Sequence, residues 1–343
     1  MPLPFRAREH VASVGLVASA GDGSTTDGSI PDPTTTHTTQ PSSARPRLSP
    51  QTTGLLALAI ATLFFSSAWP LTKQAIAAGT TPSWFGAGRA GLSCLGTAVL
   101  LGVVGRFRMP GRADVPAILA VGLLQVAGYF ALAHEAVAWV SAGRTAILAN
   151  TTTVWIVPLS LLVLHEAIPA RRWLAAGLGL AGIAVLASPW SIDWGSLPVV
   201  VGHLFLLGAA LSWSVAIVVT RLAPPVLSML QLLPWCFLVA SALLVPLAWL
   251  YAPDGSFGTQ PISWFALGFI GFIAGPVGTW GVMEATARLP AMVSSIGFLA
   301  TPAISLILAN LFLGERFTAD LLLGAGLIMA GVVCAAWPGK RVR

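Results

Sequence analysis

The sequence predicts an all-α integral membrane protein with ten transmembrane helices, arranged as two inverted five-helix repeats. Composition is the first reason, because 56% of the 343 residues are hydrophobic and only 9% are charged, whereas soluble domains carry about 25% charged residues. An internal repeat is the second reason, since residues 134–187 align with residues 283–336 at a constant shift of 149 positions. The third reason is a biased distribution of basic residues between the two sides of the predicted membrane.

The repeat is specific because it matches acidic residues. Glu135 aligns with Glu284, and Glu166 aligns with Glu315. Matches between Ala and Leu carry little information in so apolar a chain, but the chain has only 12 acidic residues in total. Two halves built on one pattern therefore indicate an internally repeated membrane protein.

The N-terminal residues 1–53 differ from everything that follows, because they are rich in Ser, Thr, Pro and Gly. Such a segment buries too little apolar surface to offset its chain entropy. We therefore expect a disordered cytoplasmic tail here. The two five-helix repeats are expected to follow it, over residues 54–189 and 198–337.

Ten apolar segments lie after the tail, and each approaches the length of about 20 residues with which a helix crosses a bilayer. Short connections that contain turn-forming Pro and Gly residues separate them. The shortest connection, Val140–Gly143, separates the third segment from the fourth. The predicted helices are 54–79, 83–104, 115–138, 141–164, 171–189, 198–221, 228–251, 263–286, 291–313 and 318–337.

Basic residues predict the orientation of these helices. With the N-terminus inside, 14 of the 18 Lys and Arg residues fall on the inner side, while the outer loops keep acidic residues such as Asp193 and Asp254. This is the positive-inside distribution, and it predicts a multi-pass protein of the cell membrane with both termini cytoplasmic. Each repeat crosses the membrane five times, so the first repeat starts on the inner side and the second starts on the outer side. The second repeat is therefore expected to be inverted relative to the first.

Several function classes find no support in the sequence. The net charge of +6 reflects basic loops, and no basic run with interleaved aromatic residues suits a nucleic acid. The three cysteines are isolated within apolar stretches, which predicts neither disulfides nor a metal cluster. No phosphate-binding loop or catalytic constellation is evident. We therefore expect no enzymatic activity, no metal and no cofactor.

Ionisable residues at membrane depth are the first candidates for function, because they normally face a cavity or a partner. Lys73, Arg89 and Glu135 all fall near the outer side, where Glu135 could pair with Lys73 or Arg89. The functional interpretation is an outer gate or an anchor for a charged substrate. The equally weighted alternative is a fold-stabilising ion pair, or side chains that reach the interface.

The repeat places Glu284 at the position of Glu135, but in a helix that runs the other way. Glu284 is therefore expected near the inner side, together with Arg221 and Arg288. An inner gate opposite an outer gate is one interpretation. An ordinary acidic helix end is the other, and it carries equal weight.

Polar and aromatic side chains deeper in the helices complete the candidate site. Hydroxyl and amide residues often only join helices, and packing is the favoured interpretation for each one taken alone. Tyr129 and Asn150 are the polar candidates. The aromatic candidates for a cavity wall are Trp69, Trp155, Trp213 and Trp280. Gly177 with Gly182, and Gly326 with Gly331, predict close helix packing at the seam between the repeats or at a homodimer contact.

This combination of features resembles the EamA-type transporters of the drug/metabolite transporter superfamily, over about residues 54–337. Each half ends in a Leu-x-Glu sequence, a short loop and a helix with Gly, and Arg89 stands where the family often carries an arginine. The matching residues are Leu164-His165-Glu166, Leu313-Gly314-Glu315, Pro302, and Ser67-Ala68-Trp69 followed by Lys73.

The resemblance implies a secondary transporter, an exporter of a small organic metabolite such as an amino acid, that works by alternating access. Proton coupling through Glu135 or Glu284 is one option. A multidrug exporter of the same fold is the first alternative, although Lys73 and Arg89 oppose cationic drugs. A membrane enzyme or scaffold is the second alternative, for which no constellation of catalytic residues is found.

Overall fold

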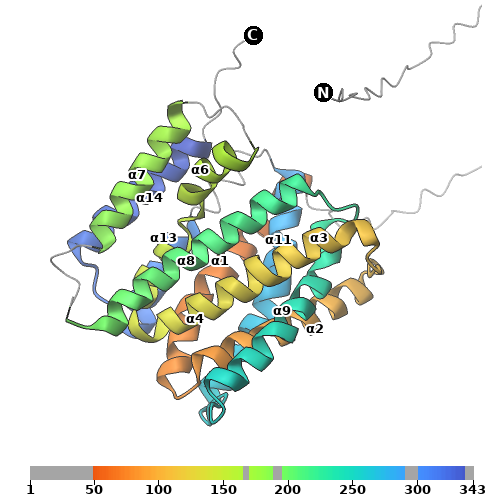
Figure 1. Ribbon diagram of the computed structural model, residues 1–343, viewed down its shortest axis with the longest axis horizontal. Helices are drawn as coiled ribbons and strands as arrows, with labels where there is room; N and C mark the ends of the chain where they lie inside the picture. The colour runs from red at the N-terminus through yellow and green to blue at the C-terminus, as the bar shows by residue number, and fades with distance from the viewer. Residues whose placement is uncertain (1–48, 165–169, 188–194, 290–299, 337–343) are drawn as a thin grey trace, which may run out of the picture. The chain divides into compact units, whose positions relative to one another are not determined.

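The computed structural model describes residues 49–164, 170–187, 195–289 and 300–336 (Figure 1). Within these residues every regular element is helical. Most of the predicted tail lies outside them. Its last residues do not, because Pro50 begins α1 (Pro50–Ala77), with the Ser49 side chain accepting a hydrogen bond from the Thr52 backbone amide. A serine cap followed by proline at the first helical position is a strong start signal, so the helix begins before the predicted residue 54.

The first half contains eight further elements after α1 within the described residues. The four segments from Arg112 to Trp139 follow one another without a gap and form one long rod. These elements are α2 (Pro82–Val103), η1 (Arg112–Asp114), α3 (Val115–Leu119), η2 (Ala120–Gly128), α4 (Tyr129–Trp139), α5 (Ala142–Ala149), α6 (Thr152–Leu164) and α7 (Ala170–Ala187).

The second half repeats this order closely. The rod Arg112–Trp139 has its counterpart in the rod from Pro261 to Arg288, and both bounds differ by the same shift of 149 positions. The helices α7 and α14 are likewise related by this shift. The elements are α8 (Leu197–Leu222), α9 (Met229–Tyr251), α10 (Pro261–Gly268), η3 (Phe269–Ala274), α11 (Gly275–Arg288), α13 (Ala300–Leu313) and α14 (Ala319–Ala336).

Both long rods contain a π-helical segment at the same place. The first is η2 and the second is η3, and each begins 149 positions from the other. A π-helical turn inserts a residue into the α-helical hydrogen-bond pattern and is commonest at functional positions. Its recurrence means that the repeat preserves an irregularity of the backbone as well as the helix lengths.

The predicted single helix over 141–164 is wrong, because the structure breaks it into α5 and α6. The α5 helix ends at Ala149, and the Asn150 amide side chain donates to the Ala146 carbonyl at 2.6 Å. The Thr151 hydroxyl donates to the Leu148 carbonyl at 2.7 Å. These side chains satisfy backbone carbonyls that a continuous helix would otherwise pair, as short polar residues do at helix ends.

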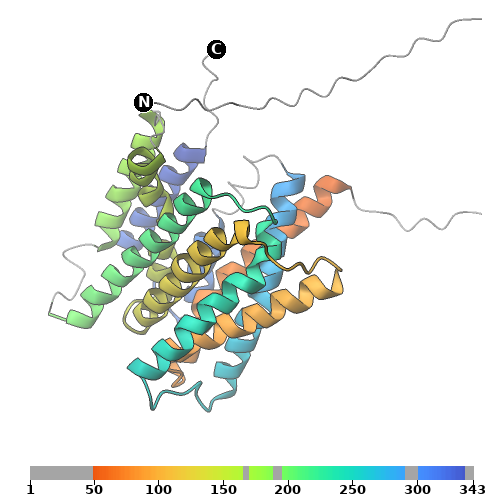
Figure 2. The same cartoon turned by 45° about the vertical axis from the view of Figure 1, so that its right-hand side comes forward.

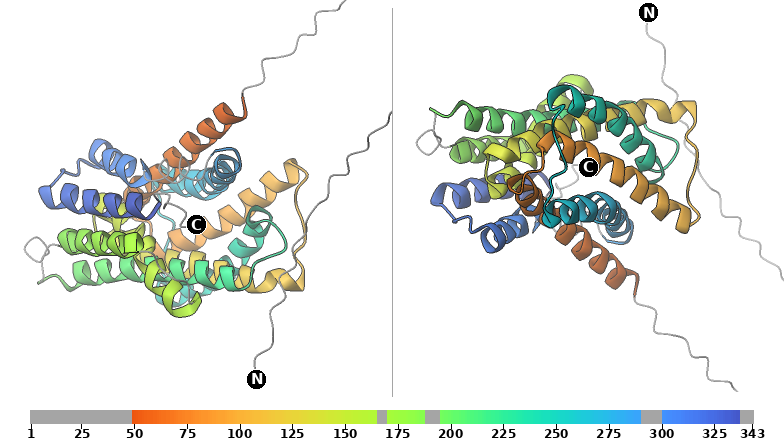
Figure 3. Two further views of the ribbon diagram at one scale, coloured as in Figure 1. Left: turned by 90° about the horizontal axis from the view of Figure 1, so that it is seen from above. Right: turned by 90° about the horizontal axis from the view of Figure 1, so that it is seen from below.

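The helices α7 and α14 pack against each other reciprocally, and they lie side by side in both views of Figure 3. A Cβ atom on Gly182 would lie 2.8 Å from the Gly324 carbonyl oxygen, and one on Gly331 would lie 2.7 Å from the Ala175 carbonyl oxygen. Late residues of each helix thus meet early residues of the other, so the two helices run antiparallel. Reciprocal contacts of this kind indicate a two-fold relation.

The prediction of close packing holds for only one glycine in each of these helices. Gly182 and Gly331 are buried at the seam, whereas Gly177 and Gly326 are exposed, with no atom within 4 Å of an added Cβ. The seam therefore joins the two repeats within one chain. The alternative use of these glycines in a homodimer stays a prediction.

The same two-fold relation governs other helix pairs. The Ser66 hydroxyl in α1 donates to the Thr301 carbonyl in α13 at 2.9 Å, and the Ser214 hydroxyl in α8 donates to the Thr152 carbonyl in α6 at 3.0 Å. Likewise α1 packs on α11 as α8 packs on α4, and α2 packs on its own counterpart α9 (Figure 2). Each half thus contributes its helices to the core of the other.

Six helical segments among the described residues are long and apolar enough to cross a membrane. Three shorter apolar helices lie in α7, α13 and α14. Large apolar side chains such as Leu63, Leu204 and Trp249 are exposed on these helices, which is expected where the surroundings are lipid. The chain is therefore a multi-pass membrane protein.

Candidate functional site

Lys73, near the end of α1, binds the C-terminal end of α4. Its ammonium group donates to the carbonyls of Val137 at 2.5 Å, Ala138 at 3.3 Å and Val140 at 2.9 Å. Helix-end carbonyls lack helical partners and carry partial negative charge. Lys73 forms no ion pair with Glu135 among the described residues, so the predicted pairing of Lys73 with Glu135 is wrong.

Glu135, on α4, contacts the beginning of α2. Its carboxylate lies near the backbone amide of Ser83, the second residue of that helix. A carboxylate is favoured at this place because the first amides of a helix are unpaired and carry partial positive charge. Glu135 and Lys73 together bind α4 to α2 and α1, each through helix-end backbone and neither through the other.

Arg89, one and a half turns further along α2, is half-buried against α4. Its guanidinium lies over the Phe130 ring at 4.4 Å from the centroid. Its Nη1 is 3.5 Å from Nε2 of the fully buried His134. Arg89 Nε is buried without a hydrogen-bond partner. The predicted pairing of Arg89 with Glu135 is therefore also wrong, since no contact of Arg89 within the described residues involves a carboxylate.

Three of the predicted aromatic residues form a row across α1, α4 and α8. The Trp69 and Tyr129 ring centroids are 6.3 Å apart, and those of Tyr129 and Trp213 are 5.0 Å apart in an edge-to-face arrangement. These are favourable aromatic geometries. Trp155 and Trp280 make no ring contact with another described aromatic residue, so the structure does not bring all four tryptophans together.

Asn150 and Trp155 flank the break between α5 and α6. The Asn150 side chain is exposed and bonds the Ala146 carbonyl, whereas Trp155 is half-buried and its indole Nε1 is buried without a partner. A buried indole N–H normally finds an acceptor. Trp155 therefore offers an unused hydrogen-bond donor close to the start of α6.

Glu284, on α11, has different contacts from its counterpart Glu135. Its carboxylate accepts a hydrogen bond from Arg288 Nε at 2.5 Å, one turn along the same helix. Arg221, at the end of α8, is exposed. Of the two predicted neighbours, Arg288 thus binds Glu284, and it does so within one helix without joining α11 to α8 or α9.

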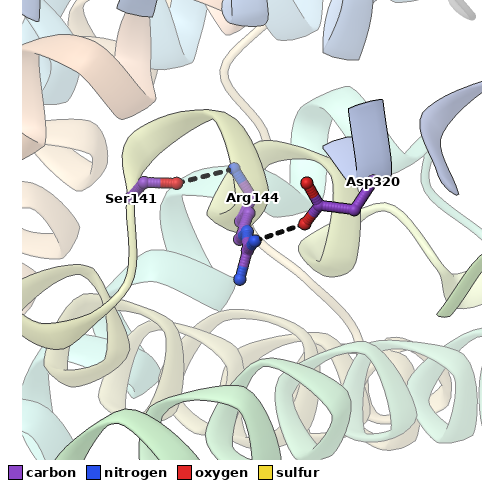
Figure 4. Close-up of polar contacts among 3 residues, drawn as sticks. All are labelled: Ser141, Arg144 and Asp320. Carbon is purple, nitrogen blue, oxygen red and sulfur yellow. Dashed lines mark hydrogen bonds and ion pairs between the residues drawn. The ribbon is translucent and has the colours of Figure 1, made fainter. Parts of the chain in front are cut away.

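Sequence reasoning missed two interactions that hold α5 in place. The Glu315 carboxylate accepts hydrogen bonds from the first amides of α5, from Ala142 at 2.6 Å and from Gly143 at 2.9 Å. Arg144 donates to Asp320 of α14 at 2.5 Å, as Figure 4 shows, while its backbone amide donates to the Ser141 hydroxyl. The repetition of a glutamate before the last helix was the available signal for Glu315. Nothing in the spacing linked Arg144 with Asp320.

His134 is the other residue that sequence reasoning missed. Its Nδ1 donates to the Phe130 carbonyl at 2.7 Å, which leaves Nε2 as an acceptor facing Arg89. Its position four residues after Phe130, which places both residues on one face of the helix, was the only available signal. Among the described residues no group of three or more His, Cys, Asp or Glu side chains is arranged to hold a metal ion.

In a comparison with known proteins, one family model matches two successive segments of the chain. The profile of the EamA-like transporter family matches residues 52–188 and again residues 200–337. The uncharacterized transporter YdfC of Bacillus subtilis is 26% identical over 238 residues, which cover 69% of this chain and 76% of that protein.

Two further similarities agree with this result. The uncharacterized transporter YoaV of Bacillus subtilis is 23% identical over 216 residues, covering 62% of this chain and 72% of that protein. A crystal structure of another protein superimposes on this chain with a TM-score of 0.58 at 21% sequence identity. The match covers 84% of this chain and 96% of the chain in that crystal structure. This structural likeness shows a shared fold.

Proposed function

Because the chain belongs to the EamA-like transporter family, we propose that it is a secondary transporter, an exporter of a small organic metabolite such as an amino acid, that works by alternating access. In this proposal ten helices cross the cell membrane as two inverted repeats, 54–189 and 198–337. Both termini lie in the cytoplasm. The biased basic residues support this topology, together with the antiparallel packing of α7 on α14.

One observation carries the mechanism: the C-terminal ends of the two equivalent rods pack differently against the neighbouring helices. The α4 end of the first rod packs on both α1 and α2. The corresponding α11 end makes only slight contact with α9, and no comparable contact with α8, among the described residues. Inverted repeats that adopt two different arrangements alternate access to a site between them. The proposed state is closed at the outer side and open at the inner side.

The candidate residues take roles in this mechanism according to their contacts. Lys73 and Glu135 form the proposed outer gate, because they bind α4 to α1 and α2. Glu284 belongs to the proposed inner gate. The remaining candidates line the proposed solute path: Trp69, Arg89, Tyr129, Asn150, Trp155, Trp213 and Trp280.

Counterflow in proteoliposomes tests the proposed function. Liposomes containing the purified full-length protein are loaded with one unlabelled metabolite from a panel of amino acids and organic acids, and uptake of the labelled compound is followed. Uptake above the level of protein-free liposomes is expected for at least one compound. An imposed pH gradient then tests proton coupling. No counterflow for any compound, with folded protein in the liposomes, would contradict the proposal.

Topology is tested separately with reporter fusions. A reporter active only in the cytoplasm is fused after Arg343, and one active only outside the cell is inserted into the loop 252–261. Both reporters are expected to be active. An outside signal at the C-terminus would contradict the ten-helix topology, because an even number of crossings returns the chain to its starting side.

A further inference from the structure

Three basic side chains lie within α1, α2 and α5, and their charges are compensated differently. The Lys73 ammonium group donates to three backbone carbonyls. Arg144 forms an ion pair with Asp320. Arg89 has neither arrangement in the described part of the chain, since its contacts there are the Phe130 ring and His134. Arg89 is thus a cation inside the bundle without a counter-charge.

The neighbours of Arg89 cannot neutralise it. His134 is engaged through Nδ1 with the Phe130 carbonyl, so that Nε2 offers Arg89 a lone pair at 3.5 Å but no charge. The ring of Phe130 offers a cation–π contact, which stabilises a charge without removing it. Nε of Arg89 is buried and unpaired. A buried charge in this state is unfavourable unless a partner binds it.

We infer that Arg89 binds the carboxylate group of the transported solute, which makes the substrate class a small organic anion or an amino acid. The guanidinium presents a planar set of donors that matches the two oxygens of a carboxylate. Arg89 is half-buried, so the protein does not cover the residue completely. The inference rests on the proposed transport function, because it names the chemical class that such a transporter would carry.

Aromatic side chains surround Arg89. His134 lies beside Trp69, with ring centroids 6.4 Å apart, and Phe130 lies beside Tyr129 at 6.3 Å. The Arg89 site is therefore continuous with the aromatic row that ends at Trp213. Aromatic faces accommodate apolar and aromatic groups. A carboxylate attached to an apolar body matches both parts, whereas a cationic drug would be repelled by Arg89.

Binding to the purified full-length protein tests this inference without requiring transport. Acetate, L-leucine and L-phenylalanine are each compared with their primary amides, and chloride serves as a simple anion, with intrinsic tryptophan fluorescence as the readout. At least one carboxylate is expected to bind tenfold or more tightly than its amide. In Arg89→Gln that carboxylate should bind at least about 30-fold more weakly, as for loss of one partner of a buried charge pair.

Two further variants control the experiment. Arg89→Lys should keep part of the affinity, because it retains the charge but loses the planar pair of donors. Arg106→Gln removes an exposed arginine beyond the end of α2 and should bind like the wild type. Equal binding of carboxylates and amides, retention of the preference in Arg89→Gln, or binding of chloride alone would each overturn the inference.

Thermal unfolding without solute supplies an independent readout. Arg89→Gln should melt at or above the wild-type temperature, because it removes an unpaired charge. Arg144→Gln should melt lower, because it leaves Asp320 without its arginine. A lower melting temperature for Arg89→Gln would show a structural role for Arg89 and contradict the inference.

Counterflow separates this inference from the proposed transport function. If the protein exchanges an amide as well as the corresponding carboxylate, the inference about Arg89 is overturned, but transport is supported. Carboxylate binding without counterflow would contradict transport alone.

Discussion

The C-terminal ends of α4 and α11 hold equivalent places in the two repeats, but they have different contacts. At the α4 end, Lys73 binds three carbonyls and the Glu135 carboxylate lies near the Ser83 amide. At the α11 end, Glu284 binds Arg288 of its own helix, and Arg221 is exposed. Arg221 corresponds to Lys73, since the two family matches begin 148 positions apart, at residues 52 and 200.

This difference teaches that one sequence pattern supports two arrangements. The groups that close the α4 end have counterparts at the α11 end, where a basic residue ends α8 and a glutamate lies in α11. A closed α11 end would use Arg221 and Glu284 as the closed α4 end uses Lys73 and Glu135. The two repeats agree at the α7–α14 seam and differ at these two ends.

The largest expected effect comes from preventing the α4 end from opening. Cysteines at Ser83 and Glu135, in a background without the native cysteines, should react with a short bifunctional thiol reagent and abolish counterflow. The matched pair is Leu230 with Glu284, because Leu230 is also the second residue of its helix. That pair should cross-link poorly in the described state. Equal cross-linking of both pairs would contradict the difference between the ends.

Removing the lysine at the closed end should have the next largest effect. Lys73→Met leaves the Val137, Ala138 and Val140 carbonyls without their donor, and we expect a loss of about 2–3 kcal/mol in the free energy of unfolding. Arg221→Met, the equivalent change at the other end, should alter it by less than about 0.5 kcal/mol. Thermal unfolding in detergent compares them. A similar loss in both variants would mean that the two ends are equally closed.

The seam offers a test of what the repeats share. Gly182→Ala places a Cβ 2.8 Å from the Gly324 carbonyl oxygen, and such crowding lowers the free energy of unfolding by about 1–3 kcal/mol. Gly177→Ala, in the same helix, meets no atom within 4 Å and should be neutral or stabilising, because alanine favours helix. Unfolding curves of the two variants give the comparison. Equal effects would indicate that α7 and α14 do not pack as described.

The smallest stability effects are expected for the two glutamates. Glu135→Gln keeps an acceptor for the Ser83 amide but loses the charge near a helix N-terminus, which corresponds to about 0.3–1 kcal/mol. Glu284→Gln removes one partially exposed ion pair, worth about 0–1 kcal/mol. Protein level, uphill flux and exchange are measured for both. If one variant keeps exchange but loses uphill flux, the glutamate that it replaces carries the coupling proton, whereas full uphill flux in both variants would exclude the gate and proton-carrier roles.

Much of the fold was predictable from residue types and spacing. The alignment of Glu135 with Glu284 correctly related the rods that end at Trp139 and Arg288. Hydrophobic segments located the helices to within a few residues for most of the described chain, because a membrane crossing requires a length set by the bilayer. The break at Asn150 was not predictable from hydrophobicity, since α5 and α6 are both apolar.

The contacts of the charged candidate residues were not predictable from the sequence. Sequence reasoning found Lys73, Arg89 and Glu135 because charge is rare and unfavourable at membrane depth. It paired them with one another, since opposite charges at similar depth attract. In the structure, Lys73 and Glu135 instead lie against unpaired carbonyls and amides at helix ends, and Arg89 lies beside a neutral histidine.

The sequence by itself determined the helices, the repeat and the charged residues that interrupt the apolar stretches, because each depends on local composition or on periodicity along the chain. Only the tertiary structure decided which helix end each charged residue meets and which end of the bundle is closed. Those outcomes depend on the distance and direction between backbone groups of different helices. The same pattern at Glu135 and Glu284 is compatible with either contact, so packing between the repeats selects the one that forms.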